Sequence, residues 1–115
     1  MLFCLGNELP LQVPITSQDV VGLSARNPAA STGDLTVTTG LGTTITGGNR
    51  GIYARNLGSG SLNVTTNGDV TGTGATSAGI DARNYGTDLS VTTDLGTTAV
   101  GRNYGIRARN LGSGA

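Results

Sequence analysis

The sequence predicts an all-β fold, a right-handed parallel β-helix (β-solenoid) of about three and a half rungs. One six-residue word, Gly-Ile/Leu-x-Ala-Arg-Asn, occurs four times, beginning at Gly22, Gly51, Gly79 and Gly105. Successive copies therefore start 29, 28 and 26 residues apart, a period typical of stacked solenoid units. Between copies, runs such as residues 62–66 alternate aliphatic and polar side chains, as half-buried strands do. The 20 glycines argue against helices, which glycine destabilises.

The four copies divide most of the chain into repeats, which span residues 22–50, 51–78, 79–104 and, truncated, 105–115. Each repeat is expected to hold three strands, separated by turns rich in Gly, Asn, Ser and Asp. In the second repeat these strands are 52–55, 62–66 and 69–71.

Successive side chains of a strand point to opposite faces, so alternation assigns an inner and an outer face to each strand. Every inward position is expected to be aliphatic. These positions are Leu23, Ala25, Leu35, Val37, Ile45, Ile52, Ala54, Leu62, Val64, Val70, Ile80, Ala82, Leu89 and Val91. In the last strand of the third repeat the register is open, because either Ala99 or Val100 can point inward.

Residues 1–21 lack the word and are interpreted as an irregular N-terminal segment or a degraded half-rung. Two short stretches, 11–13 and 19–20, echo later strands. Pro10 and Pro14 lack an amide hydrogen, so a regular ladder through this segment is expected only at a sheet edge.

The apolar start of the chain, residues 1–5, has no basic residue before it. It is shorter than the roughly 7–15 apolar residues of a signal peptide. No other stretch approaches the ~20 apolar residues of a membrane-spanning helix. As written, the chain is expected to be soluble and to carry no export signal of its own.

A flat antiparallel meander is the main rival fold. It requires tight hairpins between all successive strands, whereas a word that recurs once per three strands fits coiling better. Stacked equivalent strands form parallel sheets, and the connections between parallel strands are almost always right-handed.

Composition limits the available chemistry. Seven arginines balance seven acidic residues, and the chain has neither lysine nor histidine. Zero net charge provides no global field for nucleic acid or an anionic membrane. The one cysteine, Cys4, has no partner for a disulfide within the chain. The aspartates considered for catalysis are scattered without a common column: Asp34, Asp69, Asp81, Asp88 and Asp94. We therefore predict no enzyme, no catalytic residues, no cofactor and no metal site.

The last residue of the word predicts a structural ladder at the first corner, formed by Asn27, Asn56, Asn84 and Asn110. An amide side chain carries both a donor and an acceptor, so each asparagine can bond to the copies above and below it. Asparagine also tolerates the left-handed backbone conformation that a corner can require.

The arginine of the word predicts an outward column of Arg26, Arg55, Arg83 and Arg109. Such a column is a possible track for a polyanion such as a sulfated glycan or lipopolysaccharide. A solvated stripe is the favoured interpretation, because Asp81 is expected on the same face and the total charge is zero.

A second outward column pairs Thr36 with Thr38, Asn63 with Thr65 and Ser90 with Thr92. Thr-x-Thr arrays on a flat solenoid face can match an ice lattice, so ice binding is an alternative. Only the first rung has the full Thr-x-Thr pattern. An ordinary sheet surface is favoured, because threonine is common on exposed strands.

The succession Gly-Ile-x-Ala-Arg-Asn, Leu-x-Val-Thr-Thr and Gly-Asp-Val-Thr-Gly, over residues 22–115, resembles the passenger repeats of bacterial autotransporters. Those passengers are right-handed parallel β-helices. The resemblance implies export across the outer membrane and display at the cell surface, often as an adhesin or its stalk. The export signal and the C-terminal translocator barrel of that family are not in this sequence.

We therefore expect a structural stalk or spacer segment of an autotransporter-like surface protein, with some contribution to adhesion. The expected partners are the rest of a longer solenoid chain and host or cell-surface glycans, not nucleic acid. The alternative is a ligand-binding solenoid, which uses its threonine column for ice or its arginine column for glycans and other polyanions.

Overall fold

The computed structural model describes residues 2–5, 8–11, 15–16 and 21–114. These residues form thirteen strands and no helix. Sheet A stacks β1 (Leu2–Leu5), β4 (Val21–Asn27), β7 (Arg50–Asn56), β10 (Ala78–Asn84) and β13 (Tyr104–Asn110). Sheet B stacks β2 (Glu8–Leu11), β5 (Leu35–Thr39), β8 (Leu62–Thr66) and β11 (Leu89–Thr93). Sheet C stacks β3 (Ile15–Thr16), β6 (Thr44–Gly47), β9 (Asp69–Gly72) and β12 (Ala99–Val100).

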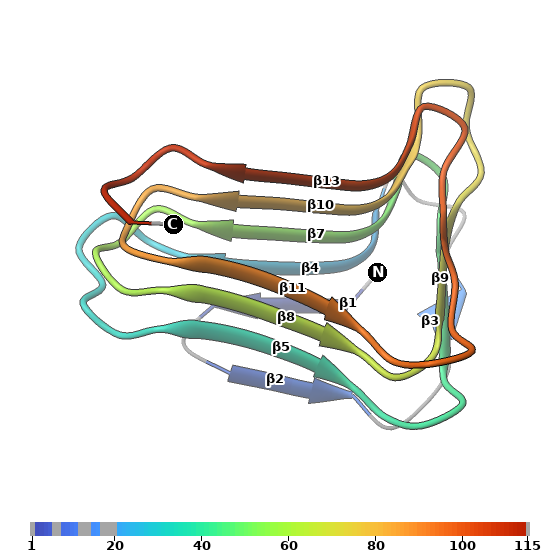
Figure 1. The fold of residues 1–115 in the computed structure, drawn as a ribbon, viewed down its shortest axis with the longest axis horizontal. Helices are drawn as coiled ribbons and strands as arrows, with labels where there is room; N and C mark the ends of the chain where they lie inside the picture. The colour runs from blue at the N-terminus through green and yellow to red at the C-terminus, as the bar shows by residue number, and fades with distance from the viewer. Residues whose placement is uncertain (1, 6–7, 12–14, 17–20, 115) are drawn as a thin grey trace.

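All strand pairs in the three sheets are parallel, so the chain is a β-solenoid with one strand per sheet in each rung. In Figure 1 the chain runs leftward along sheet A, rightward along sheet B and upward along sheet C, and later rungs lie nearer the viewer. The coil is therefore right-handed, as expected for parallel connections. The antiparallel alternative is wrong.

The copies of the word lie in register in sheet A. Leu23, Ile52, Ile80 and Ile106 are direct neighbours from rung to rung, and so are the alanines and arginines of the word. The copies are unequally spaced because the corners between strands differ in length from rung to rung. The first corner takes residues 28–34, 57–61 and 85–88 in successive rungs. Insertions therefore change the turns while the strands keep their alignment.

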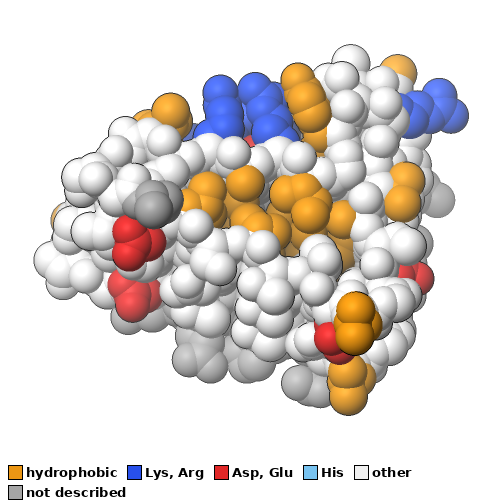
Figure 2. All heavy atoms as spheres, viewed as in Figure 1, with side chains coloured by type: hydrophobic (Ala, Val, Ile, Leu, Met, Phe, Trp, Pro, Cys, Tyr) orange, Lys and Arg blue, Asp and Glu red, His pale blue; other side chains and the backbone are white. Residues whose placement is uncertain are grey.

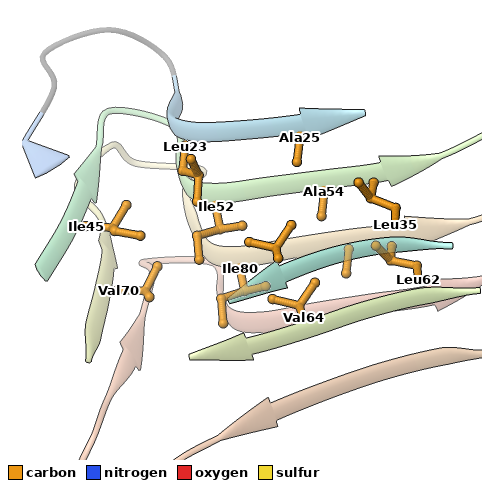
Figure 3. Close-up of a cluster of buried hydrophobic side chains, with 12 residues drawn as sticks. Leu23, Ala25, Leu35, Ile45, Ile52, Ala54, Leu62, Val64, Val70 and Ile80 are labelled. Atoms are coloured by element: carbon orange, nitrogen blue, oxygen red, sulfur yellow. The ribbon is translucent and has the colours of Figure 1, made fainter. Parts of the chain in front are cut away.

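The core is a narrow column of packed aliphatic side chains between the three sheets. Figure 3 shows Leu23, Ile52 and Ile80 of sheet A following one another along one side of it. The residues that are fully buried or nearly so include Leu23, Ala25, Leu35, Val37, Ile45, Ile52, Ala54, Leu62, Val64, Val70, Ile80 and Ala82. In the last rung Leu89, Val91 and Ala99 are only partly buried, and Ile106 is 43% exposed. The hydrophobic core is therefore partly exposed to solvent at this end of the stack.

The open register of the third repeat is resolved by β12. Ala99 pairs with Val70 and packs against the core, whereas Val100 pairs with Thr71 and is half exposed. The inward position of this strand is thus filled by a small side chain.

The glycine that begins each word lies where the chain passes from sheet C to sheet A. A Cβ atom on Gly51 would lie 2.4 Å from Cγ1 of Val70 and 2.7 Å from the carbonyl oxygen of Gly79. A Cβ atom on Gly22 would lie 2.7 Å from the carbonyl oxygen of Thr46. Glycine is required here by this close approach of neighbouring strands and not by its backbone angles, because the positive φ values of described glycines occur at Gly42 and Gly96.

The described part of residues 1–21, interpreted above as an irregular segment or a degraded half-rung, forms one strand of each sheet. Strands β1, β2 and β3 each pair in parallel register with the strand above. Pro10 lies in β2, at the edge of sheet B, where a missing amide hydrogen is tolerated. Leu9, not Leu11, is the partner of Val37, so the echo that we read at residues 11–13 does not set the register. Pro14 and the echo at residues 19–20 lie outside the described residues.

The structure contains no helix that could span a membrane within its described part.

Candidate functional site

The outer face of sheet A gathers six of the seven arginines and all three tyrosines of the sequence, and we call it the arginine face. It comprises Ser24, Arg26, Arg50, Tyr53, Arg55, Asp81, Arg83, Tyr85, Tyr104, Arg107 and Arg109. Alternation explains most of it, because the third and fifth residues of each word point away from the core. Arg50 and Tyr104 reach this face from the corner with sheet C, since both contact its side chains.

The predicted arginine column is present in the structure. Arg26, Arg55, Arg83 and Arg109 are direct neighbours from rung to rung. The third residue of the word forms a second column beside it, with the sequence Ser24, Tyr53, Asp81, Arg107. The second column has a different residue in each rung, so its chemistry depends on which rung is considered.

Asp81 is the centre of the arginine face and its side chain is 1% exposed. Its Oδ2 accepts hydrogen bonds from Nε of Arg50 at 2.8 Å and from Nη2 of Arg83 at 3.1 Å. Its Oδ1 accepts a third bond from Nε of Arg83 at 3.2 Å. The two guanidinium groups also lie over the ring of Tyr53, at 4.5 Å and 5.4 Å from its centroid. The carboxylate of Asp81 and the ring of Tyr53 therefore hold the side chains of Arg50 and Arg83 in place.

Burial of Asp81 raises its pKa, but the hydrogen bonds and charges of Arg83 and Arg50 together outweigh burial and hold this pKa below its ordinary value. The hydrogen bond to Asp81 raises the pKa of Arg83. The carboxylate of Asp81 and the guanidinium group of Arg83 are therefore charged at neutral pH.

Replacing Asp81 with asparagine is expected to reduce the free energy of unfolding by about 1–3 kcal/mol at pH 7, because Arg50 and Arg83 lose their anionic partner. The folded-state pKa is depressed, so this stabilisation is complete above about pH 4, the ordinary range for an unfolded aspartate. It is lost as the pH falls through the folded-state pKa. Urea unfolding of both proteins across acidic pH measures the difference.

The exposed Asp94, whose carboxylate accepts a bond from the amide of Leu95, provides the control. Asp94→Asn should change stability little, because asparagine keeps an oxygen acceptor. A loss for Asp81→Asn that stayed equal at every pH would show that the charge of Asp81 is not what stabilises the fold.

Other arginines of the face keep hydrogen-bonding capacity. Arg55 lies over Tyr85 at 5.9 Å, and Arg107 lies over Tyr104 at 5.2 Å. The Nε atoms of Arg55 and Arg109 are buried and have no hydrogen-bond partner. In the arginine column these two residues flank Arg83, which is held by Asp81.

Although the net charge is zero, the positive and negative side chains lie on different parts of the surface. Six of the seven arginines of the sequence belong to the arginine face, and among described aspartates only Asp81 lies with them. The other described aspartates, Asp34, Asp69, Asp88 and Asp94, belong to corners or to sheet C. In Figure 2 most of the blue atoms gather above the strands of sheet A with only a small red area beneath them, and the other red atoms lie away from them.

The asparagines form a ladder at the first corner. Nδ2 of Asn56 donates to Oδ1 of Asn84 at 2.9 Å, and Nδ2 of Asn84 donates to Oδ1 of Asn110 at 3.1 Å. Oδ1 of Asn56 also accepts from the backbone amide of Gly58, two residues further on. The ladder is irregular at Asn27, whose Nδ2 bonds to the carbonyl of Gly33 while its Oδ1 has no partner.

The different bonding of Asn27 coincides with the longest first corner, residues 28–34. The suggestion of a left-handed asparagine is wrong, because no described residue other than glycine has a positive φ. The side chains stabilise the corner by hydrogen bonds to its amides and carbonyls instead.

Sheet B carries the predicted threonine columns, but with mixed composition. Thr36 lies beside Asn63, and Thr38 lies beside Thr65. On the other side of Thr36 and Thr38, the edge strand β2 has Glu8 and Pro10 in register. A regular Thr-x-Thr lattice does not extend beyond one rung.

Our expectation that every inward position is aliphatic is wrong at Thr39 and Thr66, which are both 1% exposed. Thr39 accepts a bond from the backbone amide of Asn67 through Oγ1 at 2.9 Å, and its carbonyl accepts from Nδ2 of Asn67 at 2.7 Å. Period-two alternation would have revealed these threonines, because they follow two inward aliphatic residues in each strand of sheet B.

Asp34, in the first corner, and Asp69, the first residue of β9, connect neighbouring rungs. Oδ1 of Asp34 accepts from the backbone amide of Ser61 at 2.8 Å, and Oδ1 of Asp69 accepts from that of Thr98 at 2.9 Å. Within the described residues no three acidic or sulfur ligands gather as a metal site would require. The bonds of Asp34 and Asp69 join neighbouring rungs and so stabilise the stack.

Comparison with known protein families, with curated proteins and with solved structures found no match to this chain.

Proposed function

We propose that this chain is a structural, non-enzymatic segment of a longer β-solenoid, a stalk or spacer in an autotransporter-like protein of the cell surface. The observation that carries the proposal is the in-register stacking of the word in sheet A. A repeat that occupies the same place in every rung adds length without a new core.

The polar side chains support a structural role. The asparagine ladder and the bonds of Asp34 and Asp69 all run between rungs or within corners. Asp81, the buried carboxylate of the arginine face, is engaged by Arg50 and Arg83. Each of these groups already has a partner that stabilises the stack. The resemblance of the repeats to autotransporter passengers supports placement at the cell surface.

Insertion of extra rungs tests the spacer proposal. Three further copies of residues 51–78, placed after Ala78, should lengthen the solenoid by about 14 Å, at about 4.8 Å per rung. The melting temperature should also rise, because each new rung adds interfaces with its neighbours. Small-angle X-ray scattering measures the length, and circular dichroism measures the melting.

As a control, a scrambled insert of the same composition should add chain without ordered length. An ordered insert that left the length unchanged, or a repeat insert no better than the scrambled one, would refute the spacer proposal. Protease treatment of intact cells that make the full-length protein tests the surface location, since a surface stalk must be accessible from outside.

A further inference from the structure

We propose that the arginine face binds an extended anionic polysaccharide, one that carries carboxylate or sulfate groups. The proposal goes beyond the spacer function, because a spacer requires length and stability but no ligand. It rests on three properties of the face: the separation of charge, the unused donors of its arginines, and its direction along the stack.

The separation of charge gives the face a local field that the whole chain lacks. Six arginines accompany a single one of the described aspartates there. Asp81 is already bound to Arg50 and Arg83. The charges of Arg26, Arg55, Arg107 and Arg109 are not offset by a described carboxylate on this face. An anion that approaches sheet A therefore meets a positive surface despite the zero net charge of the molecule.

The donors of the face are only partly used. The buried Nε atoms of Arg55 and Arg109 have no hydrogen-bond partner, and an unsatisfied buried donor is destabilising. A guanidinium group offers a planar fork of donors that matches a carboxylate or a sulfate. Because Arg55 and Arg109 are only partly buried as residues, an anion beside them pairs with the exposed end of each guanidinium group, and the buried Nε atom gains an acceptor when the side chain turns outward.

The direction of the columns favours a linear polymer. Arg26, Arg55, Arg83 and Arg109 follow one another from rung to rung, and neighbouring strands lie about 4.8 Å apart. A chain lying along the stack meets a guanidinium group at each rung, and an anion beside Arg55 is about 10 Å from one beside Arg109. Several weak contacts along one polymer act together as a multivalent site.

The aromatic side chains favour a glycan over a single-stranded nucleic acid. Nucleic-acid sites of this kind stack bases on open aromatic rings. Here Tyr53, Tyr85 and Tyr104 each have an arginine guanidinium over the ring. The tyrosines therefore orient arginines. The face presents guanidinium groups to an anion, whereas a nucleic-acid base would need an open aromatic ring on which to stack.

Affinity chromatography and calorimetry with two probes test the proposal, heparin for sulfate and polygalacturonate for carboxylate, with dextran as the neutral polymer. The unchanged chain should bind at least one anionic probe at low salt and should not bind dextran. Binding should weaken as salt rises, because the contacts are between exposed charges. The double variant Arg55→Gln/Arg109→Gln should lose about tenfold or more in affinity.

Two further variants make the test specific. Arg102, which lies in the corner between β12 and β13 and outside the arginine face, is the matched control, and Arg102→Gln should leave affinity within about twofold. Asp81→Asn should increase affinity severalfold, because it releases Arg50 and Arg83 from their carboxylate. Circular dichroism of each variant establishes that it is folded.

Several results would overturn the proposal: no binding to either anionic polymer, an equal loss for Arg102→Gln, or tighter binding of single-stranded DNA through the same arginines. None of these results bears on the spacer function, which depends on the length added by extra rungs. Conversely, failure of the rung insertion would leave the binding data of the unchanged chain intact.

Discussion

Replacing Gly51 with alanine is expected to lower the free energy of unfolding by about 3 kcal/mol, at the upper end for an overpacked site. The new Cβ atom would lie 2.4 Å from Cγ1 of Val70 and 2.7 Å from the carbonyl oxygen of Gly79. Val70 belongs to the packed core, and Gly79 belongs to the next rung. The substitution therefore forces sheet C away from sheet A or the next rung away from its neighbour.

The same substitution at Gly105 is the matched control. A Cβ atom there would have one close contact, 2.7 Å from the carbonyl oxygen of Ala99, in the last and most open rung. Gly105→Ala should therefore cost clearly less than Gly51→Ala in urea or thermal unfolding. If the two variants were equally stable, close approach between sheets would not be the reason for the glycine of the word.

Replacing Asn56 with alanine is expected to cost about 3 kcal/mol, because three partners lose a hydrogen bond at once. Nδ2 of Asn56 donates to the carbonyl of Gly60 at 2.8 Å and to Oδ1 of Asn84 at 2.9 Å, and Oδ1 accepts from the amide of Gly58 at 3.1 Å. These bonds are buried, so water cannot readily replace them. Chemical denaturation monitored by circular dichroism measures the loss.

Asn27 provides the comparison within the same column. It is equally buried, but its Nδ2 bonds to the carbonyl of Gly33 and its Oδ1 has no partner. Asn27→Ala should cost about 1 kcal/mol, close to one hydrogen bond. An equal cost for the two variants would mean that the volume of the asparagine stabilises the corner and that its ladder of bonds does not.

The repeat was sufficient to predict the architecture. Because the word has the same length and polarity in each copy, its residues must occupy equivalent places in a stack, and Ile52 and Ile80 are direct neighbours as expected. Alternation then separated inner from outer residues. It was incomplete at Thr39, because we assumed that inward residues must be aliphatic, whereas a corner threonine can bond to the backbone amide of Asn67.

The interactions of the arginine face were harder to predict. The third residue of the word varies from copy to copy, so its partners depend on which rungs are adjacent. Asp81 was expected to weaken the arginine column by its charge alone. In the structure it binds Arg50 as well as Arg83, and Arg50 lies before the word, at a corner whose geometry alternation does not describe. The register between the two adjacent strands β7 and β10 was needed to find this cluster.

Spin labels on sheet B test the in-register stacking most directly. In a Cys4→Ser background, nitroxides at Thr65 and Thr92 occupy paired positions of neighbouring strands, about 4.8 Å apart. Nitroxides at Thr38 and Thr92 share the same column but are separated by an intervening strand. The stacking predicts strong spin–spin broadening for the first pair and much weaker broadening for the second. Equal spectra for the two pairs would contradict the stacked rungs on which every proposal for this protein depends.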